Sequence, residues 1–201
     1  MASSATPYGA RPIGTLSASG SFTSKTRLLE IASGYATAIF NGDFVTLVAA
    51  GTVEKDTGTT LSCCGIFLGC QYTDAGSGQL TFSTQWPATT VAADAKAFVL
   101  DDPDVLMQMQ ADGPITLTQR GLNAAVIQTA GSTLIGKSKV AMDSGTATAP
   151  AGTSTLPLRI IDFVDGPDSA VGDGFTDVIV KFNAASSFTT SIHQYLNATG
   201  A

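Results

Sequence analysis

Charged side chains are scarce in this sequence of 201 residues, making up 13% of the chain where about 25% is usual for a globular domain. Hydrophobic residues account for 44%, so much of the surface has to consist of Ser, Thr, Gly and Ala. Such a surface suits large packed interfaces, because charged residues are depleted at interface centres. A Gly- and Thr-rich β protein that is merely poor in charge would have the same composition.

Basic residues are outnumbered by acidic ones, which leaves a net charge of −6. This balance argues against binding to nucleic acids or acidic membranes, since phosphate contacts need clustered Lys and Arg. The charge is also unevenly distributed: Arg11, Lys25 and Arg27 precede every acidic residue, whereas Asp residues gather in 101–112 and 162–177. This asymmetry allows head-to-tail contact between copies, and it is equally compatible with acidic turns that face solvent.

Long apolar runs are missing as well. No run approaches the roughly 18 apolar residues of a membrane-spanning helix, and residues 1–24 lack the continuous apolar segment of a secretory signal. The three cysteines, Cys63, Cys64 and Cys70, form an odd, clustered set, which is not a disulfide framework. Strand alternation places Cys64 and Cys70 on one face and Cys63 on the other, as buried free thiols in a protein made in a reducing compartment.

Histidine occurs once, at His193 in the polar C-terminal stretch, and we interpret it as a surface residue. A Ser-His-Asp or Cys-His site would have to use it, from a segment that supports catalysis poorly. The cysteines lack the C-x2-4-C spacing of zinc sites, and phosphate-binding glycine motifs are missing. The sequence therefore predicts no catalytic residues, no cofactor and no enzymatic activity.

Acidic stretches leave calcium binding as an alternative. Asp162, Asp165, Asp168 and Asp173 follow one another closely, and residues 101–104 contain three more carboxylates. Calcium takes oxygen ligands, but neither spacing matches the EF-hand loop, and acidic turns between strands are common. We therefore predict no metal site. Nothing in these stretches selects the carboxylate pair that a glycoside hydrolase needs.

Alternation of apolar and polar residues is the dominant pattern. Residues 79–86 place Leu80, Phe82 and Trp86 on one face, and residues 105–110 alternate in the same way. Residues 118–129 are the one candidate for a short helix, which Gly121 weakens. The pattern predicts a mainly β protein, a barrel or sandwich of short antiparallel strands with little helix. Strands are also expected at 28–32, 35–40, 43–49, 65–72, 96–100, 138–142, 158–164 and 177–182.

Three regions are expected along the chain. Residues 1–24 are polar and interrupted by Gly and Pro, which is typical of an extended N-terminal arm. Residues 25–112 are expected to form a first, barrel-like β unit that ends at the turn Asp112-Gly113-Pro114. Residues 113–201 are expected to form a second β unit with a C-terminal tail.

Many short segments spread over nearly the whole chain resemble the capsid decoration (cement) proteins of tailed bacteriophages. They lie at residues 8–13, 33–36, 41–45, 52–56, 65–69, 86–88, 101–105, 108–113, 158–163, 169–173, 178–183 and 193–195. The resemblance implies a β-barrel or β-tulip module, often a homotrimer, on the outer capsid surface of the virion. It implies the major capsid (coat) protein as partner, with synthesis in the cytoplasm of the bacterial host.

Basic residues near the N-terminus are the candidate capsid contacts, together with one tyrosine: Tyr8, Arg11, Lys25 and Arg27. An arm that carries Arg11, Lys25 and Arg27 suits an acidic coat surface, and Tyr and Arg dominate interface hot spots. A disordered tail without a function is the alternative interpretation of the same segment. For the whole chain, a phage tail, connector or fibre component and a secreted β-sandwich adhesion or carbohydrate-binding module remain open.

Overall fold

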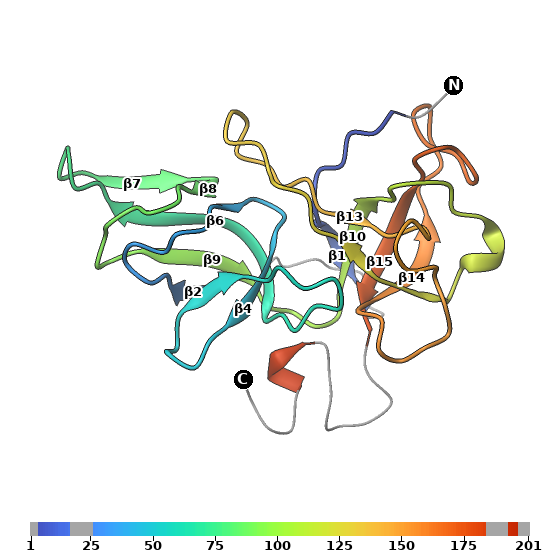
Figure 1. The fold of residues 1–201 in the computed structure, drawn as a ribbon, viewed down its shortest axis with the longest axis horizontal. Helices are drawn as coiled ribbons and strands as arrows, with labels where there is room; N and C mark the ends of the chain where they lie inside the picture. Colours follow the sequence, from blue (N-terminus) through green and yellow to red (C-terminus); the bar gives the residue numbers. More distant parts are fainter. Residues whose placement is uncertain (1–3, 17–25, 184–192, 197–201) are drawn as a thin grey trace.

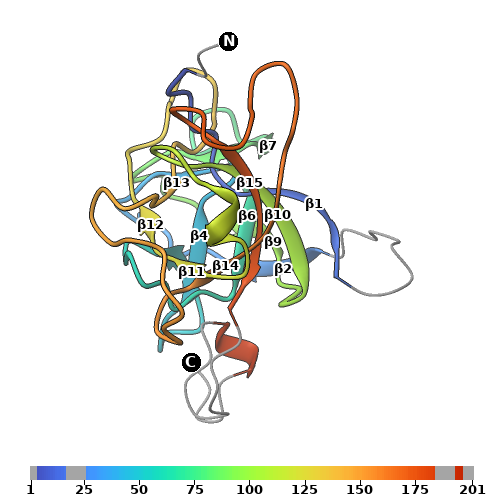
Figure 2. The ribbon, with the colours of Figure 1, turned by 90° about the vertical axis from the view of Figure 1, so that its right-hand side faces the viewer.

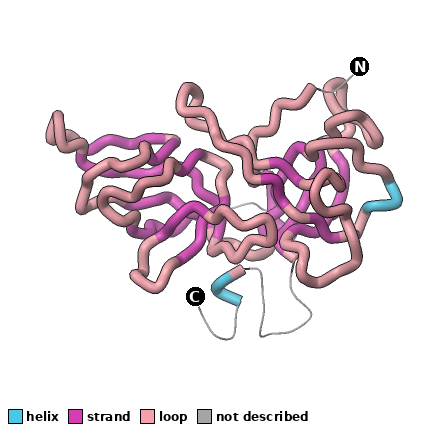
Figure 3. The backbone as a smooth tube through the Cα atoms, in the orientation of Figure 1, coloured by secondary structure: helices cyan, strands magenta, loops and turns pink. Residues whose placement is uncertain are grey.

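The computed structural model describes residues 4–16, 26–183 and 193–196, and nearly all regular structure in these ranges is β-strand (Figure 3). Two short 3-10 helices, η1 (Leu117–Gln119) and η2 (Gln194–Leu196), complete it. The strands are β1 (Arg11–Thr15), β2 (Thr26–Glu30), β3 (Ile39–Phe40), β4 (Phe44–Leu47), β5 (Val53–Lys55), β6 (Gly65–Thr73), β7 (Leu80–Ser83), β8 (Gln85–Trp86), β9 (Lys96–Leu100), β10 (Val105–Gln110), β11 (Asn123–Ala124), β12 (Val126–Ile127), β13 (Ala141–Met142), β14 (Leu158–Phe163) and β15 (Asp177–Phe182).

Two antiparallel sheets make up most of the fold (Figure 1). The five-stranded sheet has the order β1-β10-β15-β14-β11. The six-stranded sheet has the order β2-β9-β6-β4-β5, and its sixth strand, β7, also pairs with β6. The described strands form no closed barrel. The mainly β, antiparallel prediction is therefore confirmed, in a sandwich-like form.

Alternation along the six-stranded sheet builds two hydrophobic cores. Ile66 and Leu100, paired across β6 and β9, point into a core shared with the five-stranded sheet. The neighbouring residues Phe67 and Val99 point the other way, into a second core around Trp86. Close packing of β6 on β9 needs Gly65, because an added Cβ atom would lie 2.3 Å from the backbone oxygen of Leu100.

The cysteines follow the same alternation. Cys63 lies in the shared core, whereas Cys64 and Cys70 lie in the core around Trp86. All three are buried free thiols. The prediction that Cys64 and Cys70 face one way and Cys63 the other is confirmed.

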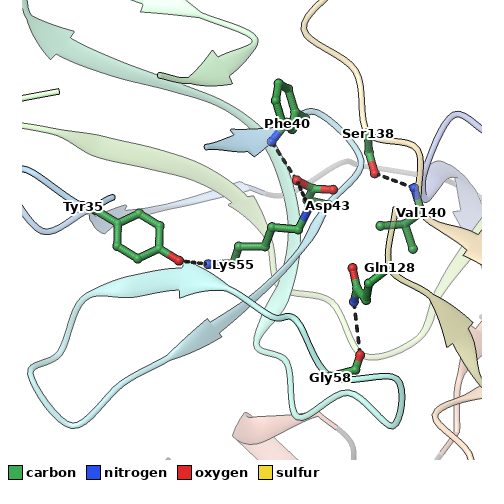
Figure 4. Close-up of polar contacts among 8 residues, drawn as sticks. All are labelled: Tyr35, Phe40, Asp43, Lys55, Gly58, Gln128, Ser138 and Val140. Atoms are coloured by element: carbon green, nitrogen blue, oxygen red, sulfur yellow. Dashed lines mark hydrogen bonds and ion pairs between the residues drawn. The ribbon is translucent and has the colours of Figure 1, made fainter. Parts of the chain in front are cut away.

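A buried ion pair anchors the loop between β3 and β4 to β5 (Figure 4). Lys55 Nζ lies 3.1 Å from Asp43 Oδ2, with side chains that are 8% and 0% exposed. The same carboxylate oxygen accepts the Phe40 N–H at 2.9 Å, and the Lys55 backbone N–H donates to the Tyr35 hydroxyl oxygen at 3.0 Å. The buried Asp43 carboxylate therefore has the Lys55 ammonium group as its counterion.

The N-terminal segment differs from the predicted arm. Residues 11–15 form β1, which pairs with β10 from Arg11–Gln108 to Thr15–Val105, with a register shift between Pro12 and Gly14. Backbone pairing with β10 satisfies polar groups that an arm would leave to water, so the Gly and Pro content does not exclude a strand at the sheet edge. The arm prediction is therefore wrong for residues 11–15.

The predicted boundary at residue 112 also separates strands that belong together. β10 was assigned to the first unit, yet it pairs with β15 of the second from Met107–Val180 to Gln110–Asp177. The shared core likewise combines Phe44 and Ile66 with Val178. The two halves of the described chain are therefore packed through one common core.

The helix expected at 118–129 is wrong. Residues Leu117–Gln119 form a single 3-10 turn, and the chain then enters β11 and β12. The Gly121 N–H donates to the Ile160 oxygen at 2.9 Å, and the Ile160 N–H donates to the Leu122 oxygen at 2.9 Å. Pairing with β14 therefore takes up the backbone groups that a helix would use, and Gly121 adopts a φ of +84°.

Candidate protein-interaction site

Two of the four predicted contact residues, Tyr8 and Arg11, line one cleft of about 530 Å³. Its walls come from the N-terminal segment, from Gln108 on β10, from Asp177 at the start of β15 and from Lys137. Figures 1 and 2 both show the blue N-terminal segment beside the yellow segment that leads to β13. Residues that are far apart in sequence therefore form one surface.

Close backbone packing holds this wall in place. The Ala10 N–H donates to the Gly42 oxygen at 2.9 Å, and the Ser138 N–H donates to the Asn41 oxygen at 2.9 Å. Gly9 has a φ of +79°, and an added Cβ atom would lie 2.5 Å from the Ser138 Cβ. Glycine at position 9 is what lets the N-terminal segment lie against the segment that carries Lys137 and Lys139.

A second cleft of about 510 Å³ adjoins the first and shares Tyr8 and Lys137 with it. Pro7 and Ile135 give it apolar walls, and Lys139 lies at its edge. Both volumes fall within the roughly 300–1,000 Å³ that is usual for ligand-binding pockets. The two clefts together combine apolar side chains with the polar groups of Asn41, Gln108 and Asp177 and with the cations Arg11, Lys137 and Lys139.

The polar groups of the first cleft are coupled. Burial, and then the Asp177 carboxylate, raise the pKa of the Tyr8 hydroxyl well above its ordinary value, so this hydroxyl stays protonated at neutral pH. Gln108 donates its side-chain amide to Asp177 at 3.1 Å. The cations Arg11, Lys137 and Lys139 are exposed and form no ion pair within the described part of the chain.

The other two predicted contact residues are not part of this cleft. Arg27, on β2, forms an ion pair with Asp101 and lies over the ring of Tyr195, 5.1 Å from its centroid. Lys25 lies outside the described residues. Sequence reasoning missed Gln108, Lys137 and Asp177; the exposed pair Lys137 and Lys139 in an alternating segment was the one available signal.

A row of apolar side chains is exposed on the six-stranded sheet. Phe82 and Leu80 on β7 are 67% and 54% exposed, whereas Trp86, which alternation places on the same face, is buried. Phe98 on β9 pairs with Gly69, which has no side chain, so the rings of Phe82 and Phe98 stack across β6 with centroids 6.4 Å apart. Leu28 on β2, 47% exposed, pairs with Phe98 and extends the row.

His193 is buried rather than on the surface, which corrects its interpretation from the sequence. Its side chain is 1% exposed and packs edge-on against Phe182, with ring centroids 5.4 Å apart. Burial lowers the pKa of His193 below its ordinary value. Its backbone bridges to Cys63, and the following Gln194 N–H donates to the Cys63 oxygen at 2.9 Å. These contacts give the histidine a packing role.

Several of the carboxylates in the acidic stretches already have partners within the protein. Asp162 forms an ion pair with Arg120 at 2.6 Å, Asp104 pairs with Lys181, and Asp173 accepts the Ala170 N–H. Within the described ranges, no three His, Cys, Asp or Glu side chains come close enough together to hold a metal ion. Nor does any helix there have the length and apolar character to cross a membrane.

No protein-family model matches the sequence, and no curated protein or solved structure matches it at a significant level.

Proposed function

We propose that this chain is a structural protein of a tailed-phage particle, which binds the outer capsid surface as a homotrimer and cements neighbouring coat-protein capsomers. The observation that carries the proposal is the apolar row formed by Leu28, Leu80, Phe82 and Phe98. Contiguous apolar side chains on a folded surface are typical of sites that contact another protein. The scarcity of charge in the chain suits the same role, because the centres of protein interfaces are poor in charge.

The partner proposed for this row is the coat protein, which follows from the sequence resemblance. Phe82 and Phe98 are stacked before any contact is made, so little side-chain entropy is lost when they are covered. Aromatic side chains in such positions supply much of the binding free energy of an interface. Loss of either ring is therefore expected to weaken attachment by about tenfold or more.

Cosedimentation with expanded phage heads that lack the protein tests this function. We expect saturable binding, protection of the heads against heat, and weaker binding by Phe82→Ser and Phe98→Ser. Val91→Ser is the matched control, because Val91 is also 67% exposed and lies outside the row. Failure of the unaltered protein to bind heads would contradict the proposal and favour a tail component or an adhesion module instead.

A further inference from the structure

The cations of the cleft stand out in the charge distribution of the protein. Of the nine basic side chains in the described ranges, four form ion pairs: Arg27, Lys55, Arg120 and Lys181. Three of the remaining five, Arg11, Lys137 and Lys139, border the two adjoining clefts. Asp177 is the carboxylate that lines the first cleft, and it accepts the Gln108 side-chain amide, so three cations against one carboxylate leave the two clefts with a net positive charge. On a chain with a net charge of −6, this positive surface attracts an acidic group.

The same chain carries a matching acidic turn between β14 and β15. The Gly166 N–H donates to the Ser169 oxygen at 2.8 Å and the Ser169 N–H returns a bond at 3.3 Å, so Pro167 and Asp168 form the tip. Asp165 and Asp168 are exposed, and neither carboxylate has a hydrogen-bond or ion-pair partner among the described residues. Proline fixes φ at the tip, so the turn is already ordered before it binds.

We propose that the acidic turn of residues 165–168 docks into the basic cleft of a second copy of this chain. Asp165 and Asp168 would face Lys137, Lys139 and Arg11, and the ring of Pro167 would lie against the apolar walls made by Pro7 and Ile135. Charge-assisted contacts in a cleft are stronger than pairs on an open surface, because water is partly excluded. Turn and cleft are different surfaces, so the contact is heterologous and closes into a ring when the rotation between copies allows.

This contact rests on the proposed function, because it names the surfaces that would join the copies of the homotrimer, and it can be measured on the purified protein without phage heads. It uses the five-stranded sheet and the segment before β13, whereas the apolar row lies on the six-stranded sheet. Failure of head binding and failure of self-association are therefore separate results.

Charge reversal tests the contact by sedimentation velocity over a range of protein concentrations. Lys137→Asp/Lys139→Asp alters the cleft and Asp165→Lys/Asp168→Lys alters the turn. Each pair of changes is expected to weaken self-association by about tenfold or more, since close charge pairs at interfaces are strongly coupled. The chain with all four changes is expected to associate again, and an equimolar mixture of the two altered chains should also associate.

Lys96→Asp/Arg159→Asp is the control, because it makes the same change in net charge at the two remaining cations, which lie outside the cleft, and should leave association unchanged. Thermal unfolding of each variant confirms that it is folded. The inference would be overturned if the unaltered protein is a monomer. If that monomer also loses head binding when the cleft is altered, the cleft binds another acidic protein and not a second copy of this chain. Impaired pair variants without recovery in the fourfold variant would overturn it as well.

Discussion

Removing one partner of the buried ion pair between Lys55 and Asp43 should severely destabilise the protein. In Lys55→Met, the Asp43 carboxylate stays fully buried with the Phe40 N–H as its remaining donor, and Asp43 Oδ1 has no hydrogen-bond partner in the described structure. Leaving a buried charge without its counterion costs about 3–5 kcal/mol. With a slope of about 2 kcal/mol per M urea, the unfolding midpoint should fall by roughly 1.5–2.5 M.

The double variant Asp43→Asn/Lys55→Met separates this charge effect from lost packing. The amide oxygen introduced by Asp43→Asn can still accept the Phe40 N–H, and no charge is left buried, so the double variant should be more stable than Lys55→Met alone. Urea unfolding at pH 7 followed by circular dichroism gives the free energies. Lys96→Met is the control, because Lys96 forms no ion pair in the described part of the chain. A cost of less than about 1 kcal/mol for Lys55→Met would refute the reasoning, because that is the range of a surface ion pair.

Two further predictions concern buried titratable groups. Burial raises the pKa of Cys64 and of Cys70 to about 12, and raises that of Cys63 well above its usual value. A thiol reagent at pH 8 should therefore label none of the three cysteines until urea is added, because the reactive form is the thiolate. Rapid labelling of the native protein would contradict this prediction. Burial lowers the pKa of His193, so the unfolded chain binds more protons below about pH 6.5, and unfolding free energy should fall as pH drops from about 7.5 to about 5.5. His193→Gln should flatten that dependence, and an unchanged slope would show that another group titrates.

Local sequence patterns were sufficient to predict a strand and its bounds where the segment lies between two other strands of the same sheet. Residues 96–100 and 177–182 are short segments rich in apolar residues, and their predicted bounds coincide with β9 and β15. The facing of Cys63 against Cys64 followed from the same period of two, because one residue along a strand reverses the direction of a side chain.

Sequence reasoning was wrong where contacts between distant segments determine the structure. β1 is a strand because β10 lies beside it, and His193 is buried because Phe182 and Cys63 surround it. Phe82 shows the opposite error, since alternation identifies an apolar face without showing whether anything covers it. Sequence reasoning did not identify the cleft, because Tyr8, Gln108 and Lys137 are far apart in the sequence and become neighbours only in the folded chain.

The two proposed surfaces have different chemistry, and this difference is what a cementing role requires. A protein that joins neighbouring capsomers has to hold its own copies together and hold the shell, with neither contact blocking the other. A charged turn in a basic cleft is specific and sensitive to salt, whereas an apolar aromatic row keeps its strength as salt rises. Binding through both surfaces at once raises the overall affinity, because each contact increases the effective concentration of the next. Head binding should therefore weaken in the charge-reversed cleft variant even though its apolar row is intact.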